Sequence, residues 1–229
     1  MRTVGLIGGL GPETTVDYYR RIIAAWQAND PATAPHLIID SIDVQRIYWF
    51  VEFDRAGLAD YLLAAVERLA RGGADFAAIT ANMPHLAFDA VAARSPIPLV
   101  SIVATCSDAA KQRGARRLAL LGTRFTMEAP MYPDDMRRHG IELVTPEPAE
   151  RTYIHDHYSN EMIKGTFRSE VRDHVESIVA RMRDEEQIDG VILGGTELAI
   201  LLPNETVAGL PAFNTTALHV DAIVSKLRA

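Results

Sequence analysis

The stretch that decides the fold runs Val4-Gly5-Leu6-Ile7-Gly8-Gly9-Leu10-Gly11-Pro12-Glu13-Thr14-Thr15. Its short apolar run is typical of a buried parallel strand, and the glycines after it allow a tight turn close to a ligand. Proline suits the first turn of a helix, and the apolar spacing that follows predicts one over residues 12–26. Because unpaired N–H groups point out of a helix start, this stretch is a candidate anion site.

The glycine pattern of this stretch is not a dinucleotide fingerprint, because Thr14 stands where a third glycine would be expected. No Lys-Ser/Thr pair follows it, which argues against a phosphate-binding P-loop. The sequence therefore argues against a dinucleotide-binding fold. The stretch becomes informative because the chain repeats it.

The repeat has a nearly constant offset. Leu118–Thr123 corresponds to Val4–Gly9, an offset of 114 residues from position 4 to position 118, and 189–196 corresponds to 75–82 at the same offset. Pro98 and Pro211 each precede an apolar run, at an offset of 113. Such self-similarity predicts two similar α/β halves.

We therefore expect two pseudo-symmetric, Rossmann-like α/β/α domains of three layers with a cleft between them. The predicted boundaries are 1–98 plus 211–229 for a discontinuous N-terminal domain and 99–210 for the second. Strand ends after Gly8, Ile79, Gly122 and Leu193 would converge on the cleft, since open α/β sheets bind ligands at the carboxyl ends of their strands.

Composition narrows the class of protein. The chain has 229 residues, 48% of them apolar, which is enough for a folded core. A net charge of −7 without a basic run argues against nucleic acid as the main partner, and no apolar segment approaches the length of a membrane span. The single cysteine, Cys106, excludes an internal disulfide, and we expect it to be a packed thiol in a cytoplasmic protein.

Further elements follow from local patterns. We expect strands over 36–43, 76–80, 96–103, 141–146 and 191–193, and helices over 57–70, 104–112, 154–165, 169–185 and 216–227. The aromatic cluster of residues 48–51 is predicted to pack in the core, with a cover over the cleft or a dimer contact as alternatives. His155, Asp156 and His157 are spread around a helix by their spacing, so we expect no metal site there.

Several polar side chains follow the predicted strands. Arg46 could reach the cleft or lie in a solvated loop. Asn82 could hold the polar head of an amino acid, and His85 is either an acid–base group or a helix-start residue bonded to nearby backbone. In the second half, Thr123 and Thr126 flank Arg124, a geometric match for a carboxylate unless it is merely exposed.

Four motifs across the chain resemble the aspartate/glutamate racemase family, which needs no pyridoxal phosphate. Gly8–Thr15 is similar to its opening loop, and Thr80–His85 and Gly194–Glu197 are similar to its two catalytic motifs. Leu121–Glu128 is similar to the corresponding stretch of the L-aspartate/glutamate-specific bacterial branch.

The resemblance implies a cleft in which two cysteines, one from each half, flank the substrate's Cα. One thiolate removes the α-proton, and the other thiol donates a proton to the opposite face. This chain departs from that pattern at both cysteine positions, which are Ala81 and Gly195. The implied substrate-binding positions are Gly9, Pro12, Arg46, Asn82, Met83, Thr123, Thr126, Lys164 and Thr196.

We therefore expect a cofactor-independent isomerase that moves a proton at Cα of a small amino or dicarboxylic acid, working as a homodimer without a metal. The candidate proton carriers are His85, Glu197, Glu13 and Thr80. Two alternatives remain open. One is an inactive relative that binds a small carboxylate or amino acid, and the other is a relative with lyase or decarboxylase chemistry.

Overall fold

A computed structural model gives the structure of residues 1–229, apart from the side chain of Pro12. The chain forms two compact units. Unit 1 comprises 1–102 and 216–229, and unit 2 comprises 103–215. Each unit holds its own, mainly parallel sheet with helices packed on it, so the two-domain α/β fold is confirmed.

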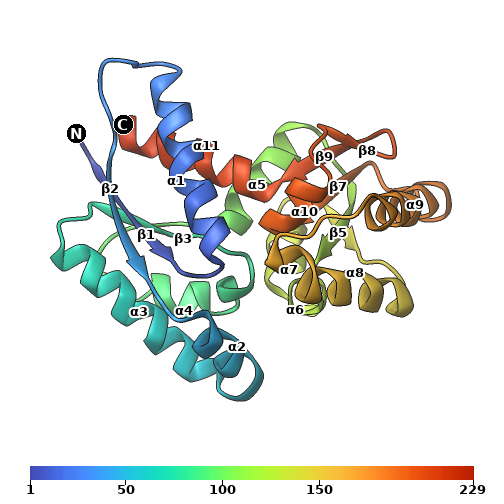
Figure 1. Ribbon diagram of the computed structural model, residues 1–229, viewed down its shortest axis with the longest axis horizontal. Coiled ribbons are helices and arrows are strands. Elements are labelled where there is room, and N and C mark those ends of the chain that lie inside the picture. The colour runs from blue at the N-terminus through green and yellow to red at the C-terminus, as the bar shows by residue number, and fades with distance from the viewer. The chain divides into compact units, whose positions relative to one another are not determined.

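Unit 1 has a four-stranded parallel sheet in the order β2-β1-β3-β4, coloured blue to green in Figure 1. Its elements are β1 (Thr3–Gly8), α1 (Pro12–Gln27), β2 (His36–Ser41), α2 (Val44–Phe53), α3 (Arg55–Arg71), β3 (Phe76–Ile79), the 3-10 helix η1 (Met83–Ala87), α4 (Phe88–Ala92), β4 (Leu99–Val100) and α11 (Thr215–Arg228).

Side chains alternate across the sheet of unit 1. Val4 and Leu6 point toward α1 and α11, with which they share a buried core. Gly5 lies against α3 on the other face, where a Cβ would come within 2.9 Å of the Cβ of Leu69. Figure 1 shows α1 and α11 beside each other, and Arg228 joins them by donating to the carbonyl oxygen of Trp26 at 2.8 Å. These contacts produce three layers.

Unit 2 has a five-stranded sheet in the order β6-β5-β7-β9-β8, in which only β8 is antiparallel. Its elements are α5 (Ile102–Gln112), β5 (Arg117–Gly122), α6 (Arg124–Glu128), α7 (Met131–Arg138), β6 (Glu142–Val144), α8 (Pro148–Asn160), the 3-10 helix η2 (Met162–Lys164), α9 (Ser169–Glu186), β7 (Gly190–Gly194), α10 (Thr196–Leu201), β8 (Thr206–Val207) and β9 (Leu210–Asn214).

The strand registers reproduce the sequence repeat. Val4 pairs with Phe76 in unit 1, and Leu118 pairs with Gly190 in unit 2, so both partners are displaced by 114 residues. Leu99 and Ala212 pair with equivalent residues of the third strand in each unit, at an offset of 113. The order β2-β1-β3-β4 in unit 1 is therefore equivalent to the order β6-β5-β7-β9 in unit 2.

Three local predictions are wrong. The predicted strand over 96–103 shortens to β4, because prolines 96 and 98 cannot donate ladder hydrogen bonds and α5 begins at Ile102. The predicted helix over 154–165 begins earlier, at Pro148, and ends at Asn160 before η2. The aromatic cluster does not form core, since Trp49 of α2 is 52% exposed.

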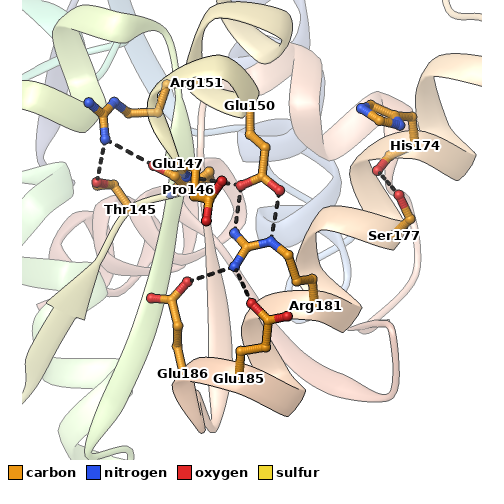
Figure 2. Close-up of polar contacts among 10 residues, drawn as sticks. All are labelled: Thr145, Pro146, Glu147, Glu150, Arg151, His174, Ser177, Arg181, Glu185 and Glu186. Atoms are coloured by element: carbon orange, nitrogen blue, oxygen red, sulfur yellow. Dashed lines mark hydrogen bonds and ion pairs between the residues drawn. The ribbon is translucent and has the colours of Figure 1, made fainter.

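An ion-pair cluster fixes α8 against α9 in unit 2 (Figure 2). The Arg181 guanidinium donates to both carboxylate oxygens of Glu150, at 2.8 and 2.6 Å, and also contacts Glu185 and Glu186. Glu150 in turn accepts the backbone N–H of Glu147 at 2.9 Å, which closes a capping box at the start of α8. Burial alone would raise the pKa of Glu150, but these donors outweigh it and lower that pKa.

Replacing Arg181 with methionine is expected to reduce the free energy of unfolding by about 1–2 kcal/mol, because a two-pronged, mostly covered pair is worth more than an exposed one. Urea denaturation at pH 7 measures the change. Arg137→Met is the matched control, because that side chain is 74% exposed and its pair with Asp134 lies on one helix. Equal losses in the two variants would contradict the prediction.

Candidate functional site

The first group of predicted residues lies at the carboxyl ends of β1 and β3, neighbouring strands of unit 1. Gly9 has a φ of +77°, and a Cβ there would run into the backbone of Ile42, so this turn requires glycine. The Gly9 N–H donates to the hydroxyl of Thr15 in α1 at 2.9 Å. The opening loop is therefore held by its own backbone and by the helix that follows it.

Thr80 and Asn82 follow β3 and are buried. The Thr80 hydroxyl donates to the carbonyl oxygen of Ile7 at 2.8 Å, so this side chain ties the ends of β3 and β1 together. Asn82 precedes η1, in which Met83 is the first residue, and the half-buried Ala81 stands between Thr80 and Asn82. The Thr80 side chain therefore has a structural role. Ala81 and Asn82, the next two residues of the first motif, directly follow it.

His85 is 4% exposed, and both of its ring nitrogens are engaged. Its Nε2 accepts the backbone N–H of Ile102 at 3.1 Å, and its Nδ1 lies 2.9 Å from the carbonyl oxygen of Ala81. A carbonyl can only accept, so the ring is a neutral imidazole with its proton on Nδ1. Burial, together with the nearby His219, lowers the pKa of His85 to about 3. This geometry favours the backbone-bonded alternative over an acid–base role.

His219 of α11 is a buried neighbour that the sequence analysis missed. Its Nε2 lies 3.0 Å from the carbonyl oxygen of Val100 and must donate to it, so its Nδ1 accepts from the hydroxyl of Tyr18 at 2.9 Å. Burial lowers the pKa of His219 to about 4 and raises that of Tyr18. A histidine within an apolar helical stripe was the available signal. The two histidines hold both sides of the segment that joins β4 to α5.

The second group lies at the carboxyl ends of β5 and β7 in unit 2. Thr123 caps α6 by accepting the Thr126 N–H at 3.3 Å, and the two hydroxyls lie 3.2 Å apart. Both strands end in glycine, and a Cβ on Gly122 would come within 2.9 Å of the Thr126 Cβ. The glycine strand ends therefore let α6 and its two hydroxyls sit directly on the sheet edge.

A phenol and a carboxylate meet beside this edge. Tyr158 of α8, 8% exposed, donates a hydrogen bond to Glu197 Oε2. The Thr196 hydroxyl donates to the same carboxylate oxygen at 2.7 Å. Gly195 directly precedes Thr196 and Glu197 in the sequence, and a Cβ on Gly195 would lie 2.5 Å from the Tyr158 hydroxyl oxygen. Tyr158 thus fills the space of a side chain at position 195, and nothing in its local sequence signals this.

The other predicted residues are more peripheral. Glu13 in the first turn of α1 is exposed, and so is Lys164 at the end of η2. Arg46 is also exposed, and its guanidinium lies 4.7 Å from the ring centre of Tyr61. The guanidinium carbon of Arg124 lies 5.6 Å from the ring centre of Phe125. The side chain of Pro12 lies outside the described residues.

Over the described residues, no three His, Cys, Asp or Glu side chains are grouped so as to hold a metal ion. Within that same part of the chain, every helix is too short or too polar to cross a membrane. Cys106 is fully buried in α5, as expected, and burial raises the pKa of its thiol.

A groove of about 490 Å³ opens in unit 1 between α1 and α11. Asp221 and Arg228 line it together with small residues, and burial raises the pKa of Asp221. None of the predicted site residues whose side chains the structure describes lines this groove, so it is separate from the strand-end groups.

Comparison with known proteins places these groups in context. Residues 7–223 match the family described as Asp/Glu/Hydantoin racemase. A putative Asp/Glu racemase from Yersinia pestis is 30% identical, with full coverage of both chains and a TM-score of 0.91. An aspartate racemase homologue from Pyrococcus horikoshii OT3 is also 30% identical, with full coverage and a TM-score of 0.88. The broad specificity amino-acid racemase RacX of Bacillus subtilis (strain 168) is 20% identical over 97% of this chain and 96% of its own.

Proposed function

The chain belongs to the Asp/Glu/hydantoin racemase family, and from this premise we propose that it moves a proton at Cα of a small amino or dicarboxylic acid without a cofactor. The family match covers most of the chain, and the similar proteins carry racemase names. The proposal concerns this chain's own side chains, since it has no cysteine at position 81 or 195.

The observation that carries the proposal is the polar cluster at the carboxyl ends of β5 and β7. Thr123 and Thr126 supply hydroxyls there, and Glu197 supplies a half-buried carboxylate held by Tyr158 and Thr196. Hydroxyls can donate to a substrate carboxylate, and a positioned carboxylate can accept a proton. Ligands of open α/β sheets bind at this edge.

Glu197 is the strongest of the four candidate proton carriers. Thr80 and His85 make hydrogen bonds that define the ends of strands and helices, and Glu13 is exposed. Glu197 instead combines partial burial with two hydroxyl donors, one from each of its neighbours in the cluster.

Solvent exchange tests this function directly. The protein is incubated with L- and D-aspartate and L- and D-glutamate in heavy water, and the Cα proton of each is followed by NMR. We expect loss of that signal for at least one substrate, and at least about a hundredfold slower loss in Glu197→Gln, the usual effect of removing a positioned acid–base group. Asp156→Asn is a matched control on a carboxylate outside the cluster.

Absence of exchange would favour the non-catalytic alternative, for which the lack of a proton-carrying side chain at Ala81 and Gly195 is the specific observation. In that case a binding ligand must still raise the melting temperature, because it binds only the folded state. The lyase or decarboxylase alternative would instead show a new product in the same spectra. The homodimer and the cytoplasmic location stay predictions.

A further inference from the structure

We propose that Tyr158 is a catalytic residue of this site, which relays the Cα proton of the substrate to Glu197. The inference rests on the proposed function, because it names the group that faces the substrate. It starts from the contact between the phenol and the backbone of Gly195 at the carboxyl end of β7.

Position 195 has no side chain, yet its side-chain space is filled. A Cβ on Gly195 would lie 2.5 Å from the Tyr158 hydroxyl oxygen, 2.7 Å from Cε2 and 2.9 Å from Cζ. The ring edge and hydroxyl of Tyr158 therefore lie where the first atoms of a residue-195 side chain would be. Any group that a larger residue would place at this strand end is replaced by a phenol from α8.

The phenol is fixed in this position by its surroundings. Its ring belongs to the buried apolar core of unit 2, which also contains Ile154 and Leu198. Its hydroxyl donates to Glu197, and α8 itself is tied to α9 by the ion pair of Glu150 with Arg181. A group held at both ends loses little freedom when it reacts, which favours proton transfer.

The relay balances without any other reactant. The Cα–H bond breaks as a new O–H bond forms at Tyr158 Oη, and the electron pair stays on Cα. At the same time the original phenol proton moves to Glu197 Oε2, so the negative charge passes from the carboxylate to the substrate carbon. The reverse transfer restores the pair, and water exchanges with the protonated carboxylate of the half-buried Glu197.

This relay acts on one face of the substrate carbon. Return of a proton along the same path restores the original stereochemistry, whereas inversion requires a proton on the opposite face. Ala81, the residue that the resemblance pairs with Gly195, cannot supply one from its side chain. We therefore expect deuterium to enter at Cα faster than the substrate racemises.

The test compares Tyr158→Phe with the intact chain, using L- and D-aspartate and glutamate in heavy water and chiral analysis of the same samples. We expect exchange at Cα to fall at least about a hundredfold in kcat, with KM little changed. Tyr153→Phe is the matched control, because it removes a phenol hydroxyl from the same helix while its ring keeps its contacts with His157 and His174. That control should exchange at the original rate.

The outcomes separate the two proposals. If the intact chain exchanges and Tyr158→Phe exchanges equally fast, the relay is wrong and the proposed function stands. If Tyr158→Phe loses rate only through a higher KM, Tyr158 is a binding residue and the relay is also wrong. If the intact chain catalyses no exchange with any of these substrates, both proposals fail.

Discussion

Gly195→Cys is expected to destabilise the fold by about 3 kcal/mol, the upper end of the usual range for overpacking a core. The backbone does not cause this loss, because Gly195 has a φ of −176°, an extended conformation open to any residue. The loss comes from the Cβ, which would overlap the ring and hydroxyl of Tyr158. That ring is fixed by the core and by Glu197 and cannot move aside freely.

Because the obstacle is one side chain, its removal should relieve the strain. Tyr158→Ala alone is expected to cost about 3–5 kcal/mol through the cavity that it leaves. Combined with Gly195→Cys it should cost clearly less than the sum of both, with a coupling free energy of about 1–3 kcal/mol, since the thiol occupies part of the vacated space.

Urea denaturation of the two single variants and the double variant measures this coupling. Gly72→Ala serves as the control for removal of a glycine, because a Cβ there would come no closer than 3.3 Å to other atoms. Strictly additive losses would show that Tyr158 does not fill the space at position 195.

Installing cysteines at both 81 and 195 should yield racemisation only when Tyr158 is also truncated.

The second large effect is expected from acid, which should lower the free energy of unfolding. His85 and His219 are buried as neutral rings with folded-state pKa values of about 3 and about 4, against 6.5 for an exposed histidine. Unfolding exposes both rings, and below pH 6.5 the unfolded chain then binds protons that the folded chain cannot. Stability that is fully present above pH 6.5 is therefore lost as the pH falls toward the folded-state values.

For His219 the loss between pH 6.5 and pH 4 is about 3 kcal/mol, from 1.36 kcal/mol per unit of pKa difference. His85 adds a loss of similar order in the same interval. Urea midpoints between pH 7.5 and pH 4.5 measure the effect in the intact chain, in His219→Gln and in His85→Gln. Each variant should start less stable at pH 7.5 and decline less steeply with acid.

His36→Gln is the control for these variants, because His36 at the start of β2 is exposed. Its profile should run parallel to that of the intact chain. If the profiles of His219→Gln and His85→Gln also ran parallel to it, the two buried rings would not be the source of the acid sensitivity.

The sequence predicted the central strands of both sheets well, because β1, β3, β5 and β7 are buried on both faces and read as short apolar runs. The offset of 114 residues found between Val4 and Leu118 returns in the strand registers. Prediction from the sequence failed where the surrounding structure overrides the local residue pattern. Residues 96–103 are apolar enough for a strand, but prolines limit the ladder, and α2 exposes the aromatic Trp49 that a core prediction would bury.

The positions of the candidate site residues along the chain could be predicted, but their contacts could not. Thr123, Thr126, Thr196 and Glu197 stand at strand ends, and their neighbours in sequence mark them. Tyr158 reaches Gly195 from a helix distant in sequence, so no spacing rule could pair them. His85 illustrates a third case, since its residue type suggested chemistry while its burial and two backbone hydrogen bonds assign it to structure.

The place of α11 has a consequence for synthesis on the ribosome. Unit 2 is one continuous segment and can fold as soon as its last strand has emerged. Unit 1 needs Val220, Ile223, Val224 and Leu227 of α11 for its core, together with the His219 ring that donates to Val100. Its first hundred residues must therefore wait, incompletely covered, until after unit 2 has been made, and we expect the exposed apolar surface to be most prone to aggregation during this interval.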